Sequence, residues 1–179
     1  MNTREILAAF DALLFERGLQ FEAVVVGGAA LNLLGTVSRE TKDCDVLDPS
    51  IPPAILAVAS EFQKREQAAG RELDQNWLNN GPASLVPQLP DGWRSRLRVV
   101  FTGRAMTLRC LGRRELLMSK LFAYCDRLED RADCIALAPT SDELAGILPW
   151  LEHQDANETW PVYVRDKLAE LAKELGHGP

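Results

Sequence analysis

The sequence is poor in histidine, which argues against one large group of enzymes. Its two histidines, His153 and His177, both fall late among the 179 residues. A serine or cysteine hydrolase needs a histidine held as a base beside its nucleophile. We therefore do not expect that class of enzyme here.

Cysteines are present but are not paired in sequence. The four of them form no CxxC motif and have no histidine at metal-ligand spacing: Cys44, Cys110, Cys125 and Cys134. A zinc site usually shows such spacing, so the pattern argues against one. Ordinary buried thiols are the expectation.

Long apolar runs are also missing. No run approaches the ~18 residues that would cross a bilayer. The first residues lead into an amphipathic helical pattern instead of a signal peptide. With 46% apolar and 26% charged residues, the composition is that of a globular chain. We expect a cytoplasmic protein that has no membrane partner.

Positive charge is scarce overall but locally concentrated. The net charge of −6 argues against a large nonspecific nucleic-acid surface, because such a surface must neutralise phosphates. No acidic residue falls between Asp91 and Glu115, and that segment contains a series of arginines: Arg94, Arg96, Arg98, Arg104, Arg109, Arg113 and Arg114. A local surface for anions is therefore compatible with the acidic total.

Part of this series alternates like a strand. Arg94, Arg96 and Arg98 have the spacing of one strand face. The opposite face would carry Leu97, Val99 and Phe101. The favoured interpretation is a solvated sheet edge that discourages aggregation. The alternative is contact with nucleotide phosphates, RNA or an acidic partner.

Periodicity predicts the order of elements along the chain. Helical spacing and capping signals predict helices over residues 3–16, 28–34, 53–69, 113–127, 130–137, 141–152 and 158–175. Apolar runs predict strands over 21–26 and 43–48 and a hairpin of 97–101 with 105–110. Residues 71–93 are rich in proline, glycine and asparagine and resemble loop.

The fold class follows from this order. We expect an α/β (α+β) fold with a mixed sheet flanked by helices. The expected division is an α/β core over residues 1–112 and a helical region over 113–179 that packs on it or forms one domain with it.

The segment from Val24 to Leu47 carries the strongest functional signal. An apolar run ends at Gly27-Gly28 and leads into a short helix, whose bare N–H groups suit a phosphate. Asp43 and Asp45 alternate on the next strand, so both carboxylates face one side and suit a divalent metal. Each motif alone has an ordinary structural explanation, as a turn or as a strand end. Together they indicate a metal-dependent reaction on a nucleoside triphosphate.

The glycine pair does not suit a dinucleotide-binding fold. A GxGxxG fingerprint would require glycines where this chain has Ala29 and Leu31 or Asn32.

These residues resemble a known family. Gly27-Gly28 followed by Asp43-Cys44-Asp45-Val46 is similar to the glycine pair and DxD motif of the polymerase-beta-like nucleotidyltransferase superfamily. Two further segments are similar to the bacterial branch that contains AbiEii-type toxin nucleotidyltransferases: Arg39-Glu40-Thr41, and Lys120-Leu121-Phe122-Ala123 with Arg127 and Asp130-Arg131-Ala132-Asp133.

The resemblance implies roles for particular residues. Asp43 and Asp45 would hold Mg²⁺ (or Mn²⁺) and take part in catalysis. The nucleotide would be bound by a set of residues from both parts of the chain: Gly27, Gly28, Arg39, Thr41, Lys120 and Arg127. Lys120 would also act in catalysis together with Asp133, although the resemblance leaves Asp130 or Asp133 as the functional acid.

The spacing of Lys120 has a structural alternative. Lys120, Tyr124 and Arg127 recur on one helix face, and the lysine and the arginine could pair with Asp130 and Asp133 in an ion-pair network.

The implied activity is transfer of a nucleoside monophosphate from an NTP to RNA, a protein or a small molecule. A toxin–antitoxin or phage-defence context, with a cognate antitoxin or operon partner, would go with it. Members that transfer nucleotides place a third carboxylate on a neighbouring strand, and the hairpin at 97–110 contains none. Asp74 could substitute, although nothing in its spacing requires it. The alternative function is a catalytically degenerate nucleotide-binding or protein-interaction module of the same fold.

Overall fold

The computed structural model describes residues 2–39, 41–128 and 130–177. Glu40, part of the predicted Arg39-Glu40-Thr41 motif, lies outside them. The described chain forms two compact units, Met1–Gly112 and Arg113–Pro179, which are treated separately below.

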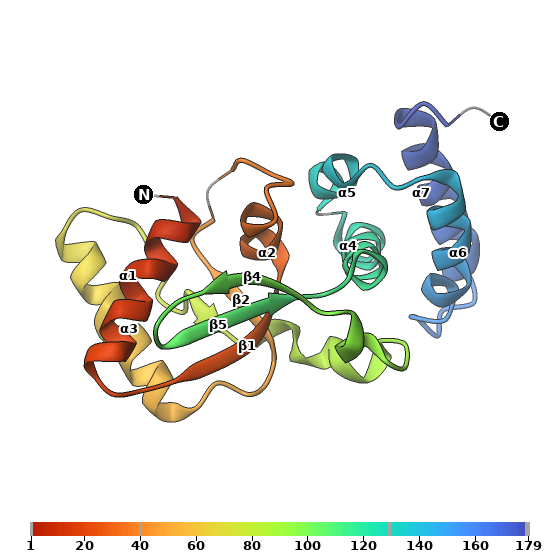
Figure 1. Ribbon diagram of the computed structural model, residues 1–179. Helices are drawn as coiled ribbons and strands as arrows, with labels where there is room; N and C mark the ends of the chain where they lie inside the picture. The colour runs from red at the N-terminus through yellow and green to blue at the C-terminus, as the bar shows by residue number, and fades with distance from the viewer. Residues whose placement is uncertain (1, 40, 129, 178–179) are drawn as a thin grey trace. The chain divides into compact units, whose positions relative to one another are not determined.

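A five-stranded mixed sheet forms the centre of the first unit, with strand order β3-β2-β1-β5-β4 (Figure 1). Its strands are β1 (Phe21–Val26), β2 (Cys44–Asp48), β3 (Leu78–Asn79), β4 (Arg98–Thr102) and β5 (Met106–Cys110). The pairs β1–β2 and β4–β5 are antiparallel, whereas β1–β5 and β2–β3 are parallel. The predicted α/β class and its mixed sheet are confirmed.

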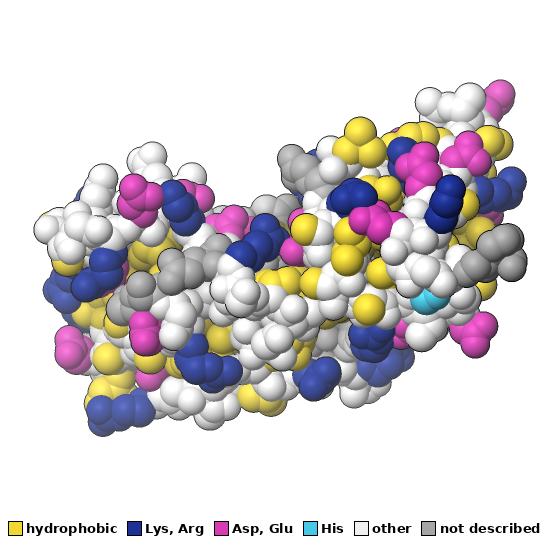
Figure 2. All heavy atoms as spheres, turned by 90° about the horizontal axis from the view of Figure 1, so that it is seen from above, with side chains coloured by type: hydrophobic (Ala, Val, Ile, Leu, Met, Phe, Trp, Pro, Cys, Tyr) yellow, Lys and Arg dark blue, Asp and Glu magenta, His cyan; other side chains and the backbone are white. Residues whose placement is uncertain are grey.

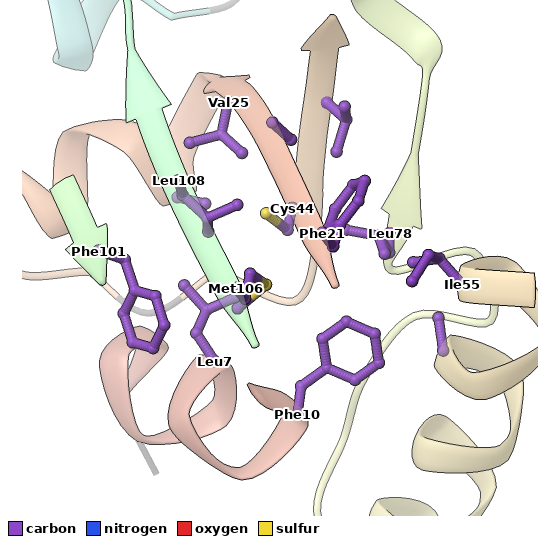
Figure 3. Close-up of a cluster of buried hydrophobic side chains, with 14 of the residues drawn as sticks. Leu7, Phe10, Phe21, Val25, Cys44, Ile55, Leu78, Phe101, Met106 and Leu108 are labelled. Atoms are coloured by element: carbon purple, nitrogen blue, oxygen red, sulfur yellow. The ribbon is translucent and has the colours of Figure 1, made fainter. Parts of the chain in front are cut away.

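The α-helices among the described residues of this unit are α1 (Thr3–Glu16), α2 (Gly27–Leu33) and α3 (Pro53–Ala68). Helix α1 begins with a capping box, in which the Asn2 side chain accepts from the Glu5 N–H and Glu5 accepts from the Asn2 N–H. Helices α1 and α3 contact each other and bury their apolar faces against one side of the sheet. In Figure 3, Leu7 and Phe10 of α1 point toward strand residues such as Met106.

The segment predicted as loop contains short elements. They are β3, the 3₁₀ helix η1 (Gly81–Gln88) and the 3₁₀ helix η2 (Trp93–Arg96). Trp77 anchors the segment, because its Nε1 donates to the Ala59 carbonyl at 3.0 Å and its ring contacts Phe10 and Phe62. A strand of two residues is too short to show alternation, which explains why it was missed.

The predicted shared face of Arg94, Arg96 and Arg98 is wrong. Arg94 and Arg96 lie in η2, where side chains do not alternate, and β4 begins only at Arg98. A bulge between Val99 and Phe101 then breaks the period of two, so Val99 is 59% exposed while Phe101 is buried.

Several arginines of the series have partners within the chain. Arg94 pairs with Asp48 and lies over the Trp93 ring, and Arg109 pairs with Glu22. Basic and acidic side chains are interspersed over the face shown in Figure 2. This pattern favours the interpretation of a solvated surface over that of a concentrated anion site.

The second unit is helical, as predicted. It contains α4 (Arg113–Arg127), α5 (Arg131–Leu137), α6 (Ser141–Glu152) and α7 (Trp160–Glu174). Helix α4 contacts α5 and α6, and α6 contacts α7. Phe122 meets the rings of Trp150 and Trp160 edge-on. Within the described residues, no helix has the length and apolar character needed to span a membrane.

A buried carboxylate fastens the β4–β5 hairpin to α1. Asp11 is 5% exposed and accepts backbone N–H groups from Arg104 at 2.9 Å, Ala105 at 2.9 Å and Met106 at 2.7 Å. A Cβ added at Gly103 would lie 2.2 Å from this carboxylate, so only glycine fits beside it. One side chain thus satisfies three donors of a turn that lies about ninety residues away in sequence.

We predict that Asp11→Ala lowers the free energy of unfolding by about 3 kcal/mol, because it leaves buried N–H groups without acceptors. Asp11→Asn keeps one acceptor oxygen and should cost less. Urea denaturation of the three proteins checks this ranking. Equal midpoints for the wild type and Asp11→Ala would show that the contact contributes nothing.

Candidate functional site

The pairing of β1 with β2 brings the two predicted motifs together. The register places Val26, the last residue of β1, opposite Asp45. Gly27 follows directly and begins α2. Cys44 belongs to the core, so the pleat directs its strand neighbour Asp45 to the opposite face. Asp43 lies one residue before β2, where the prediction had placed the start of the strand.

Asp45 lies directly against Gly27. A Cβ added at Gly27 would lie 2.6 Å from Asp45 Oδ2, and the φ of Gly27 is +70°. Both the conformation and the space therefore require glycine at this position. The glycine pair has a specific purpose here, which is to let the DxD carboxylate approach the turn.

Gly28 lies beside Thr41, and Thr41 in turn contacts the second carboxylate, that of Asp43. A Cβ added at Gly28 would lie 3.2 Å from Thr41 Oγ1 and 3.8 Å from the Arg39 guanidinium. The Thr41 hydroxyl donates to Asp43 Oδ1 at 2.6 Å. The structure thus groups six predicted site residues at the end of β1: Gly27, Gly28, Arg39, Thr41, Asp43 and Asp45.

An asparagine of α2 positions the Arg39 segment. Asn32 Nδ2 donates to the Arg39 carbonyl at 2.9 Å and lies 3.3 Å from the Val37 carbonyl. The loop after α2 is therefore folded back over the helix, which keeps Arg39 near Gly28. In the sequence, Asn32 is notable only as a position where a dinucleotide-binding fingerprint would require glycine, so its contact with Arg39 was not predicted.

Asn79 is a further member of the site that was not predicted as one. It is paired with Asp45 in the parallel β2–β3 register, and its Nδ2 donates to Asp45 Oδ1 at 3.0 Å. No sequence signal links the two residues, which are 34 positions apart.

The donor set of the site fits a hard divalent cation. Mg²⁺ binds oxygen ligands, and in nucleotide sites it is held by one or two carboxylates together with substrate phosphates and water. Asp43 and Asp45 supply two such carboxylates. Among the described residues, no group of three or more histidine, cysteine or acidic side chains could hold a metal. Asp74 is exposed and does not supply the third ligand.

Cys44, between the two aspartates, has no features of a nucleophile. It is 2% exposed, and burial raises the pKa of its thiol to about 12, with smaller contributions from the charges of Asp45 and Asp43. All four cysteines are free and buried, as predicted.

The remaining predicted residues lie in the second unit. Lys120 is 5% exposed, and its Nζ lies 2.8 Å from Asp133 Oδ2 and 3.1 Å from Asp130 Oδ1. Asp133 is 1% exposed, and Asp130 precedes α5 with a φ of +60°. The lysine pairs of the structural alternative are present, and Arg127 Nε lies 4.0 Å from Asp126 Oδ2. The roles of Lys120, Asp133 and Arg127 at a nucleotide stay predictions.

Residues 4–139 match the model of a family described as nucleotidyltransferases of unknown function (DUF6036). The chain belongs to this family. The match includes the glycine pair, the DxD motif and the Lys120 cluster, and it bears out the nucleotidyltransferase-like resemblance. No curated protein and no solved structure matches this DUF6036 chain, and the AbiEii-type branch stays a prediction.

We predict that Gly27→Ala moves the Asp45 carboxylate. The added methyl overlaps Oδ2, and the positive φ costs an L-residue about 1–2 kcal/mol. Gly28→Ala, which adds the same methyl without a positive φ, should be milder. Urea denaturation of both variants checks this ranking. Equal effects of the two substitutions would contradict it.

We predict that Cys44 does not react in the native protein. Its raised pKa keeps the thiol protonated at pH 8, so Ellman's reagent should label it only as fast as the protein unfolds. Peptide mapping that finds Cys44 labelled before unfolding would contradict this.

The same pKa predicts a loss of stability in alkali. Above a pH of about 9 the unfolded thiol ionises while the native one stays protonated up to about 12, so the free energy of unfolding falls. The slope per thiol is at most about 1.4 kcal/mol per pH unit. Urea midpoints measured from pH 8 to 10.5 should fall less steeply in Cys44→Ser than in the wild type.

Proposed function

We propose that this protein transfers a nucleoside monophosphate from an NTP to an acceptor hydroxyl and releases pyrophosphate. The observation that carries the proposal is the approach of the Asp45 carboxylate to Gly27 at the end of β1, next to Asp43 and Thr41. Membership of a nucleotidyltransferase family supports the same class of reaction.

Each residue has a physical task in this proposal. Asp43 and Asp45 would hold the cation, which supplies charge neutralisation at the phosphates. Gly27 and Gly28 would bind a phosphate through their backbone N–H groups, because Asp45 and Thr41 occupy the space beside their Cα atoms. Arg39, near Gly28, offers a planar donor to a phosphate oxygen.

The transfer itself exchanges one bond for another at phosphorus. The acceptor oxygen bonds to the α-phosphorus and loses its proton to solvent, and the bond from that phosphorus to the bridging oxygen of pyrophosphate breaks. RNA, a protein side chain or a small molecule could supply the hydroxyl. A toxin–antitoxin or phage-defence context, with a cognate antitoxin, belongs to the proposal through the resemblance alone.

A second function has its own support. Within the described residues, no third acidic side chain joins Asp43 and Asp45, although nucleotide-transferring relatives were expected to place one on a neighbouring strand. A degenerate module would bind an NTP with magnesium and not turn it over. Release of labelled pyrophosphate from γ-labelled NTPs, or incorporation of the label of α-labelled NTPs into RNA or protein, distinguishes the two functions.

Calorimetric titration of ATP, GTP, CTP and UTP, each with Mg²⁺, tests the site. We expect one nucleotide to bind in a magnesium-dependent way and the double variant Asp43→Asn with Asp45→Asn to lose at least about tenfold in affinity, which is about 1.4 kcal/mol. The substitutions keep the side-chain size and remove the charge that the cation requires.

Asp48→Asn is the matched control. Asp48 lies on β2, as Asp45 does, but it pairs with Arg94 instead of facing Gly27. The Asp48→Asn substitution should therefore leave the affinity for the nucleotide unchanged. If the folded wild type binds no nucleotide, or binds without magnesium, the proposed activity is wrong.

A further inference from the structure

The side chain of Asn79 has two polar ends, and each has a defined partner. Its Nδ2 donates to Asp45 Oδ1 at 3.0 Å, and its Oδ1 accepts from the Gly81 N–H at 2.7 Å. The partners fix the orientation of the amide, because a carboxylate only accepts and a backbone N–H only donates. Asn79 is therefore the donor toward the carboxylate.

The backbone around Asn79 is shaped to hold it there. Leu78, its strand neighbour, is buried in the core, so the pleat places Asn79 on the same face as Asp45. A Cβ added at Gly81 would lie 2.9 Å from Asn79 Oδ1, and only glycine allows this close approach.

The two carboxylates of the site are held in the same manner. The Thr41 hydroxyl holds Oδ1 of Asp43, and the Asn79 amide holds Oδ1 of Asp45. Both donors are neutral, so they orient the carboxylates without cancelling their charge. Orientation by such partners typically changes metal affinity about 10- to 100-fold.

We propose that Asn79 is a positioning residue for the metal site, which fixes the rotamer of Asp45 through its amide. This role rests on the proposed function, because it concerns the cation that Asp43 and Asp45 would hold. Asn79 acts through Asp45 and is not itself assigned to the reacting atoms.

The adjacent residue offers a matched control. Asn80 Nδ2 donates to the carbonyls of Val46 and Pro49, both at 3.0 Å, and its Oδ1 accepts from the Ile51 N–H at 2.8 Å. Asn80 therefore attaches the same segment to the end of β2 through the backbone. Its loss should weaken the fold without releasing the Asp45 carboxylate.

Titration of the full-length protein with Mn²⁺ alone, with the free ion followed by electron paramagnetic resonance, tests the role. We expect Asn79→Ala to raise the Mn²⁺ dissociation constant by about tenfold or more and Asn80→Ala to leave it within about twofold. Thermal unfolding without metal should show that both variants fold and are less stable than the wild type.

Asn79→Asp provides a second readout. It keeps the acceptor for the Gly81 N–H and replaces the donor with a carboxylate facing Asp45, so repulsion should lower the melting temperature without metal. Added Mn²⁺ screens this repulsion, and its stabilising shift in melting temperature should exceed that of the wild type. If Asn79 had only a structural role, its substitution would lower stability without changing the Mn²⁺ dissociation constant or the shift in melting temperature that Mn²⁺ causes.

The outcomes separate this inference from the proposed function. Wild-type binding with unchanged dissociation constants in both Asn79 variants would overturn the positioning role and leave the metal site standing. Absence of Mn²⁺ binding by the wild type would overturn the metal site and the role together.

Discussion

The register between β1 and β2 is the constraint on which the candidate site depends. It sets Val26 opposite Asp45, so that the Gly27 turn meets the carboxylate. A slip by one residue would turn Asp45 into the core and Cys44 out of it. That slip is opposed by the apolar residues on the core face, among them Val25, which is fully buried. The hydrophobic core therefore fixes the geometry of a polar site on the other face of the sheet.

Carboxylates of the first unit have two different roles, stabilising a turn or suiting a cation, and their hydrogen-bond partners distinguish these roles. Asp11 is buried and accepts hydrogen bonds from three backbone N–H groups, so its carboxylate has a structural role. Asp43 and Asp45 are only partly buried, and each has an oxygen that accepts from a neutral side chain, Thr41 for Asp43 and Asn79 for Asp45. Carboxylates that are oriented and still reachable from solvent suit a cation, whereas a carboxylate enclosed by backbone suits a turn. The residue type alone could not make this distinction.

The sequence predicted elements that have strong local signals. Helix α1 and strand β1 have the predicted bounds, because apolar periodicity and end signals agree there. The glycine pair and the DxD motif were found because each is a short pattern of neighbouring residues. Asn79 was not, because β3 has two residues and its contact with Asp45 spans 34 positions. The arginine face was wrong because the 3₁₀ helix η2 and a bulge at Val99, both products of tertiary context, replaced the alternation.

The charges of the predicted site residues affect whether a triphosphate can bind to them. In the second unit, one buried lysine is matched by two carboxylates, so the cluster of Lys120, Asp130 and Asp133 is formally anionic. The Asp43 and Asp45 pair is anionic too, and the whole chain carries a net charge of −6. Lys120 pairs with both carboxylates, and its removal would deprive them of this cation. In the proposed function, a divalent cation held by Asp43 and Asp45 would screen the triphosphate from these carboxylates, whichever acceptor is used.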